Sequence, residues 1–243
     1  MKSSVPPRCP ALLTLLGLIT LATSAGAAPR TPDLIWVHPR FDSLGVRSVA
    51  LLPAASFDKN RRNETFVESM FAKALQPTGY RWTTPETARD KIRGAGGDSA
   101  VAAVSNGILK TGRVDSLVAQ RLCSTLRTGA LISLRLDQFE QTQVEWNQSG
   151  KPTTTVRLRA ALVDSTGRLL WSANGSETGE GQYHEADSGT TGVSGSGLNT
   201  TPTTAQGGAP SFEDVTTRLL DRWMKRFPAR QAAATTPAAP AKP

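Results

Sequence analysis

The sequence is poor in the residues on which most catalytic and metal sites are built. Its 243 residues include two cysteines, two histidines and two tyrosines. Cys9 precedes the apolar run that opens the chain, so a processed protein keeps Cys123 alone and forms no internal disulfide. Cys123 falls on an apolar helical face, which favours a small buried hydrophobe over a nucleophile. Stability must therefore come from the hydrophobic core.

The two histidines give little support for a metal site. His38 precedes Pro39 in an extended segment, and His184 is followed by Glu185 and Asp187. The second group has the composition of a metal cluster, but loop carboxylates beside a lone histidine are usually solvated. An ordered site needs several ligands on a supporting shell. We expect no bound metal and no cofactor.

The common catalytic and nucleotide-binding motifs are also missing. The sequence contains no Gly-x-Ser-x-Gly nucleophile motif and no Walker pattern. The glycines of residues 94–97 follow a predicted helix, whereas a dinucleotide-binding loop follows a strand. Residues 54–62 follow the first strand and contain no glycine, so they offer no glycine-rich phosphate cradle. These absences predict a protein that is not an enzyme.

The first residues have the pattern of a secretory leader. Lys2 and Arg8 form a basic start, residues 11–22 are apolar, and Ala25-Gly26-Ala27 supplies small residues for cleavage. We predict a signal peptide over residues 1–27; an uncleaved anchor is the alternative. The apolar run is shorter than the roughly 20 residues of an ordinary membrane-spanning helix. No lipidation cysteine follows it, so we expect a periplasmic or secreted protein, with any outer-membrane association made without a lipid anchor.

The chain is basic, with a formal net charge of +8. Removal of the predicted leader, which holds two basic residues and no acidic one, leaves +6. No basic run is longer than the pair Arg61-Arg62, and the aromatic residues are not interleaved with basic ones. We therefore expect no nucleic-acid partner. In an exported protein the natural counterparts are anionic headgroups, cell-wall polymers or an acidic protein.

The first half of the chain predicts alternating strands and helices. An extended lead-in, 28–45, contains the apolar run 34–37, which is either an edge strand or a strap over the core. Residues 46–53 are apolar on both faces, as in a strand that is covered on both sides, and Pro53 ends them. Apolar spacing and helix-start signals predict the other elements: a helix from Asn63 or Glu64 to Gln76, a strand at 80–83, and helices at 86–92, 100–109 and 115–127, with a loop at 94–99.

The second half predicts an antiparallel meander and a final helix. Alternating residues mark strands at 130–137, 139–146, 153–164 and 168–173, joined by polar turns. The Gly, Ser and Thr composition of 185–210 predicts a flexible insertion, and 228–243 a disordered Ala/Pro tail. Residues 212–227 have helical apolar spacing. We predict one α/β (α+β) domain over 46–227, with a mixed sheet and an antiparallel C-terminal meander, flanked by helices.

Three segments together resemble a known family. They are the strand Val-Arg-Ser-Val-Ala-Leu-Leu-Pro at 46–53 with its following helix, the pair Gly79-Tyr80 before the next strand, and the hairpin Val-Asp-Ser-Thr-Gly-Arg-Leu-Leu-Trp-Ser-Ala at 163–173. Their order is similar to that of bacterial envelope proteins grouped around the curli-secretion channel subunit, the lipoprotein activators of penicillin-binding proteins and the amino-terminal domain of TolB. The resemblance covers residues 46–180 and the last helix.

The resemblance implies a compact, non-enzymatic α/β fold whose members assemble or traffic envelope components through protein contacts, sometimes as rings. Two family features are missing from this sequence. No lipidation cysteine follows the leader, and the chain has no apolar hairpin of the kind that channel-forming members insert into the outer membrane. The resemblance therefore implies a periplasmic partner-binding role and not a pore, with an envelope protein as partner and a homo-oligomer as an open alternative.

Three arginines form the only candidate binding patch. Arg135, Arg157 and Arg159 lie on the polar faces of strands that are expected to be neighbours. They could bind an anionic partner. Alternatively, they form cross-strand ion pairs with Glu140, Glu145 or Asp137, each worth roughly 0.2–1 kcal/mol. Both explanations stay open at this point.

The sequence therefore favours an exported, non-enzymatic envelope protein that binds a partner in envelope assembly, secretion or maintenance. The alternative is a secreted hydrolase or a cell-wall-polymer-binding protein whose site has no recognised motif. Nucleic-acid binding is the third reading, and it would show steep salt dependence.

Overall fold

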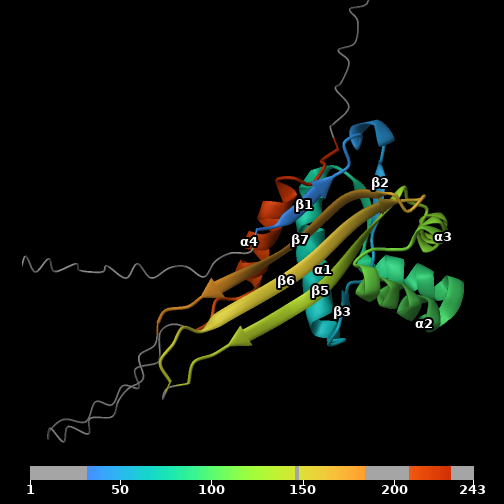
Figure 1. Cartoon of the computed structure of the whole chain (residues 1–243). Coiled ribbons are helices and arrows are strands. Elements are labelled where there is room, and N and C mark those ends of the chain that lie inside the picture. Colours follow the sequence, from blue (N-terminus) through green and yellow to red (C-terminus); the bar gives the residue numbers. More distant parts are fainter. Residues whose placement is uncertain (1–31, 146–147, 184–207, 231–243) are drawn as a thin grey trace, which may run out of the picture. The chain divides into compact units, whose positions relative to one another are not determined.

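A computed structural model describes residues 32–145, 148–183 and 208–230 of the chain. Within these ranges the strands form one seven-stranded mixed sheet in the order β1-β7-β6-β5-β2-β4, with β3 beside β5 (Figure 1). β2 runs parallel to β4 and β5, and β3 also runs parallel to β5; the other pairs are antiparallel. The strands are β1 Leu34–Val37, β2 Ser48–Leu51, β3 Ala55–Ser56, β4 Arg81–Thr83, β5 Ala130–Thr142, β6 Thr153–Asp164 and β7 Leu169–Glu180.

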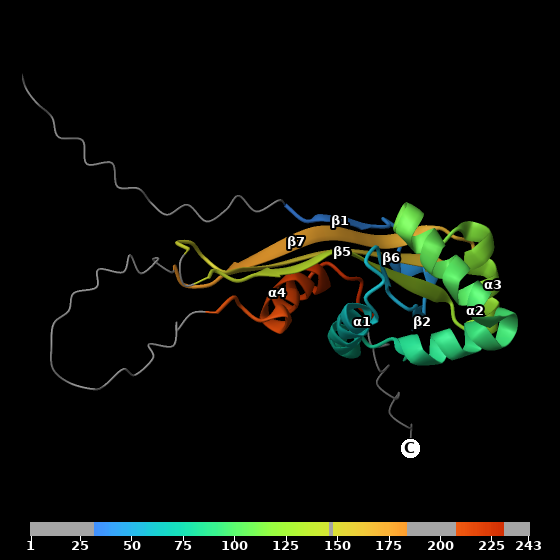
Figure 2. The ribbon, with the colours of Figure 1, turned by 90° about the horizontal axis from the view of Figure 1, so that it is seen from below.

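Helices lie on both sides of this sheet, which confirms the predicted α+β fold. α1 and α4 lie together on one side, and α2 and α3 gather at one end of the strands (Figure 2). Short 3-10 turns occupy Asp42–Leu44 and Gln76–Thr78. None of the described helices is both long and apolar enough to cross a membrane. The helices are α1 Arg61–Leu75, α2 Pro85–Thr111, α3 Ser116–Leu126 and α4 Phe212–Met224.

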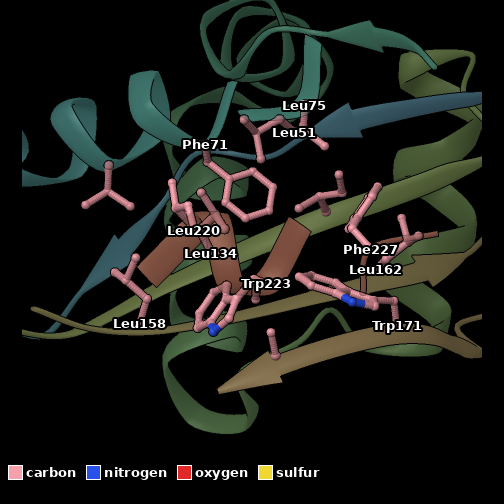
Figure 3. Close-up of a cluster of buried hydrophobic side chains, with 14 of the residues drawn as sticks. Leu51, Phe71, Leu75, Leu134, Leu158, Leu162, Trp171, Leu220, Trp223 and Phe227 are labelled. Atoms are coloured by element: carbon pink, nitrogen blue, oxygen red, sulfur yellow. The ribbon is translucent and has the colours of Figure 1, made fainter. Parts of the chain in front are cut away.

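The larger core lies between the sheet and the helices α1 and α4. Trp171 of β7 and Trp223 of α4 meet edge to face with ring centroids 6.3 Å apart (Figure 3). Phe71 of α1 and Leu51 of β2 are fully buried in the same cluster. Each such side chain contributes about 1.5–3 kcal/mol by leaving water. This core attaches the last helix to the meander.

A second core lies under α2 and α3 on the opposite side of the sheet. Ala50 of β2 and Leu131 of β5 face it from the strands, and Ile108 and Leu126 face it from the helices. Both faces of β2 are therefore buried, as the apolar run at 46–53 predicts. On the meander, this cluster reaches only the level of Leu131 and Val163. The end of α2 also contacts β5 at Arg135, and beyond that level no described helix covers this side of β5, β6 and β7 (Figure 1).

Several predicted boundaries in the first half are wrong by a few residues. α1 begins at Arg61, because the Asn60 side chain accepts hydrogen bonds from the backbone N–H groups of Arg62 and Asn63 and caps the helix. Of the two alternatives for the apolar run 34–37, the edge strand is confirmed: the run forms β1, which pairs with β7. The predicted helices 86–92 and 100–109 belong to one element, α2. It is broken only at Gly96 and Gly97, and the backbone φ of Gly97 is +71°.

The meander differs more from its prediction. The strands expected at 130–137 and 139–146 are the single strand β5, because a bulge between Leu136 and Gln138 shifts the apolar alternation without ending the strand. β7 continues to Glu180, well past the predicted end at Ala173. Its extension carries Gly175 and Gly179 on the side that α4 covers, so apolar alternation does not mark it. The predicted leader, most of the 185–210 insertion and most of the 228–243 tail lie outside the described residues.

Candidate partner-binding face

On the side of the sheet that carries α2 and α3, most of the meander is not covered by a described helix (Figure 1), and we call this uncovered part the open face. β5, β6 and β7 run past α2 and α3 (Figure 1). Alternate residues of these strands point away from the tryptophan core, as the strand period requires. Most of the residues at these positions have polar side chains. The open face comprises Leu34 and Trp36 of β1, Ser172, Asn174, Ser176 and Thr178 of β7, Thr155, Arg157 and Arg159 of β6, and Asp137, Gln138 and Glu140 of β5.

Arg135 is the most buried of the three predicted arginines. Its side chain is 9% exposed and lies where α2 ends against the sheet. Its Nε donates to Asp137 Oδ1 at 2.6 Å, and its Nη1 donates to the carbonyl of Leu109 at 2.9 Å. Its guanidinium also lies 5.5 Å from the centroid of the Phe57 ring, in a cation–π contact. All these contacts are internal, so Arg135 serves the fold.

Arg159 lies directly opposite Arg135 in the β5–β6 register. Two like charges at opposite positions repel each other. The bulge in β5 places Asp137 between them, and its Oδ2 accepts a hydrogen bond from Arg159 Nε at 2.8 Å. The Asp137 side chain is 11% exposed, whereas that of Arg159 is 43% exposed. Arg159 is therefore half satisfied internally and half available to solvent.

Arg157 differs from the other two. It is exposed, and no residue in the described part of the chain pairs with it or hydrogen-bonds to it. In the sheet register it lies between Ser176 of β7 and Gln138 of β5. The nearby acid Glu140 already accepts a hydrogen bond from Gln138 Nε2 at 2.8 Å. An anion arriving at the open face would therefore meet one free guanidinium and one partly free guanidinium, both on β6.

The edge strand adds an apolar contribution that the sequence alone did not reveal. Leu34 and Trp36 pair with Asn174 and Ser172 and lie on the open face, with 68% and 42% of their surface exposed. The Trp36 ring meets His38 edge to face, at a centroid distance of 5.9 Å. All four residues of β1 are apolar, so the sequence itself does not separate the exposed pair from the half-buried pair; only the pairing of β1 with β7 does.

The face thus combines cations, a surface tryptophan and short polar side chains from neighbouring strands. Such a surface can recognise an anionic group through charge-assisted hydrogen bonds and hold it through an aromatic contact. Within residues 32–145, 148–183 and 208–230, no group of three or more His, Cys, Asp and Glu side chains is placed to hold a metal ion. The cluster His184-Glu185-Asp187 lies outside those ranges.

Two other polar groups have structural roles. His38 Nδ1 accepts a hydrogen bond from the backbone N–H of Arg40. Burial raises the pKa of the Cys123 thiol to about 11, with Asp164 adding to the effect, so the thiol is protonated and unreactive at neutral pH.

A charged cluster on the opposite side of the sheet holds α4 in place. Arg222 of α4 bonds to Asp33 with Nε 2.7 Å from Oδ2, and it also pairs with the buried Glu177 of β7. Its Nη2 donates to the backbone carbonyl of Ser176. Gly175 has no room for a side chain, because Asp33 and the Trp223 ring lie against it. The cluster fixes the meander, and with it the open face, against the last helix.

No family model and no curated protein matches the sequence. Among solved structures, the PelC dodecamer from Paraburkholderia phytofirmans is similar at 16% identity, over 82% of this chain and 99% of its own, with a TM-score of 0.43. Lipoprotein GNA1162 from Neisseria meningitidis is similar at 19% identity, over 55% of this chain and 83% of its own, with a TM-score of 0.35.

Hypothetical protein CT253 from Chlamydia trachomatis has 9% identity over 56% of this chain and 74% of its own, with a TM-score of 0.36. Similarity at these levels assigns neither a family nor a function. The resemblance to the envelope family therefore stays a prediction from the sequence.

Proposed function

We propose that this chain is an exported, non-enzymatic cell-envelope protein that binds a protein partner during envelope assembly, secretion or maintenance. The partner presents acidic side chains to the open face. In this proposal residues 1–27 are removed as a signal peptide, and 46–227 form the binding domain together with the edge strand β1. The observation that carries the proposal is Arg157, an exposed arginine at the middle of an uncovered sheet face that has no partner in the described part of the chain.

The chemistry of the face supports an acidic partner. Asp137 is already shared by Arg135 and Arg159, and Glu140 is held by Gln138. Three arginines, Arg135, Arg157 and Arg159, therefore lie on or beside the face with two carboxylates, which leaves one net positive charge. Arginine suits this role, because its planar guanidinium binds a carboxylate through two parallel hydrogen bonds. Trp36 provides the large, rigid side chain that is enriched at the centres of protein interfaces.

Site-specific photo-crosslinking tests this function in cells. A photoreactive residue at position 176 is expected to crosslink one envelope protein, because Ser176 lies beside Arg157. The same residue at position 65, an exposed site on α1, serves as the matched control and is expected to give no such product. Identical products from both positions, or a chain that fractionates with the cytoplasm and keeps its leader, would contradict the proposal.

A cell-wall polymer is the second candidate, and Trp36 is the observation that favours it. A tryptophan face beside hydroxyl and amide side chains can stack on a sugar ring and hydrogen-bond its edge. Retention on purified cell-wall polymer that is lost in Trp36→Ala but kept in Arg157→Gln would favour this candidate. The reverse pattern, with dependence on Arg157, would favour the acidic protein.

A further inference from the structure

A groove between α2 and α3 forms a second surface, on a different part of the protein from the open face. Its volume is about 730 Å³. Its apolar wall is made by Ile92, Ala100, Ala103, Val104, Val118 and Leu122. Nothing in the proposed function uses this groove.

The groove exists because of a break in α2 and because small residues follow the break. Gly96 and Gly97 have non-helical backbone angles, so the two halves of α2 change direction at this point. Gly97 has a φ of +71°, which glycine adopts without strain. A side chain at Gly96 would come too close to the Cβ of Ala100. Ala100 and Ala103 then leave open the space that larger side chains on this helix would fill.

The polar part of the lining comes from α3. Arg121 lies there with Gln120, Ser124 and Thr125, all of them exposed. Arg121 has no hydrogen-bond or ion-pair partner among the described residues. The lining contains no acidic residue. One wall is therefore apolar, and the other carries a single uncompensated cation.

The size of the groove points to a small ligand. Its volume lies inside the roughly 300–1,000 Å³ that is usual for small-molecule sites. Twelve residues line it, fewer than the roughly 20–30 residues that a stable protein interface uses on each side. We infer that the α2–α3 groove binds an anionic amphiphile, a single alkyl chain that carries one carboxylate or phosphate head. The chain lies along the apolar wall, and Arg121 binds the head.

Calorimetric titration of the full-length protein with dodecanoate, below its micelle concentration, tests the inference. We expect saturable binding of one molecule per chain. Ala103→Trp fills the groove and should weaken binding at least tenfold. Ala102→Trp is the matched control, because Ala102 is exposed on the same helix and does not line the groove; it should bind as the parent does. Arg121→Gln should weaken dodecanoate binding and leave the affinity for uncharged dodecanol unchanged.

The midpoint of urea unfolding shows whether each variant is folded. Ala102 and Ala103 are both exposed, so each position can accept a larger side chain. The inference is wrong if dodecanoate does not saturate, or if the two tryptophan variants weaken binding equally. It is also wrong if the Ala103→Trp variant has a lower sedimentation coefficient than the parent protein, because the groove would then hold a second copy of the chain.

Discussion

The three arginines of the predicted patch should separate into a structural residue and a binding residue when they are mutated. Arg135→Gln removes two hydrogen bonds to Asp137, of 2.6 and 3.2 Å, and one of 2.9 Å to the carbonyl of Leu109. Both charged partners are about nine-tenths buried. Breaking a buried ion pair costs about 3–5 kcal/mol. Because Asp137 keeps its bond to Arg159, we expect a loss of about 2–4 kcal/mol.

Arg157→Gln should behave in the opposite way. The side chain is exposed and has no partner in the described residues, so its loss should change the free energy of unfolding by less than about 0.5 kcal/mol. Urea unfolding monitored by tryptophan fluorescence measures both variants, with the slope checked for a common unfolded state. Binding of the envelope partner should be lost in Arg157→Gln although the protein remains fully folded.

Equal destabilisation by the two substitutions would refute this reasoning. It would mean that Arg157 has an internal partner or that Asp137 does not bridge β5 and β6. Asp137→Asn supplies an independent check, because it leaves Arg135 and Arg159 facing each other without a counter-charge. Its cost should be close to that of Arg135→Gln and should grow at low ionic strength, where the repulsion is less screened.

Three further perturbations test other parts of the structure. Glu68→Gln should cost about 2–4 kcal/mol in urea unfolding, because the buried carboxylate accepts hydrogen bonds from the backbone N–H of Ala54 and from two arginines. Gly175→Ala should cost about 1–3 kcal/mol, measured by thermal unfolding, because the new methyl group displaces Asp33 from Arg222. The Cys123 thiol should resist alkylation at pH 8 until denaturant is added, since burial raises its pKa to about 11. The folded pKa lies above the usual value of 9.0, so this thiol's contribution to stability is complete below pH 9 and is lost as the pH rises to about 11. Full reaction of Cys123 in the native protein would contradict its placement.

The sequence predicted those parts of the fold in which a regular apolar pattern meets a clear stop signal. β6 occupies residues 153–164 as predicted, because Val156, Leu158, Ala160 and Leu162 recur at every second position and polar turns flank the strand. The turn that follows contains Gly167 with a φ of +79°, as a tight turn requires.

The errors occurred where a local pattern changes phase. The bulge at Asp137 moves the apolar positions of β5 by one residue. A search for one unbroken alternation of apolar and polar residues therefore predicts two strands in place of one. The end of β7 carries glycines and a buried glutamate, because α4 lies against it. These residues are suited to contact with α4 and do not show the apolar alternation of a strand. The end of β7 therefore cannot be predicted from the sequence of the strand alone.

The sequence predicts the arginines of the candidate site but not its tryptophan, because the tryptophan's position depends on a contact between distant segments. Alternation placed the three arginines on the polar faces of the strands, and the structure brings Arg135 and Arg159 together around Asp137. It leaves Arg157 unpaired among the described residues. The spacing of the three arginines in the sequence does not show which of them has an internal partner. Trp36 was missed as part of the face because its position depends on the pairing of β1 with β7, a contact between segments more than a hundred residues apart.

The dissociation constant of the crosslinked envelope partner, measured for the parent, for Arg157→Glu and for Arg62→Glu, tests the central claim most directly. Arg62 is an exposed arginine of α1, a helix that packs on the side of the sheet opposite the open face (Figure 2). Reversal of charge at position 157 should weaken binding by more than a hundredfold, and binding to the parent should weaken as salt rises. Reversal at position 62 should leave the affinity unchanged. Equal affinities for all three proteins, or equal losses in both variants, would contradict a binding face built around Arg157.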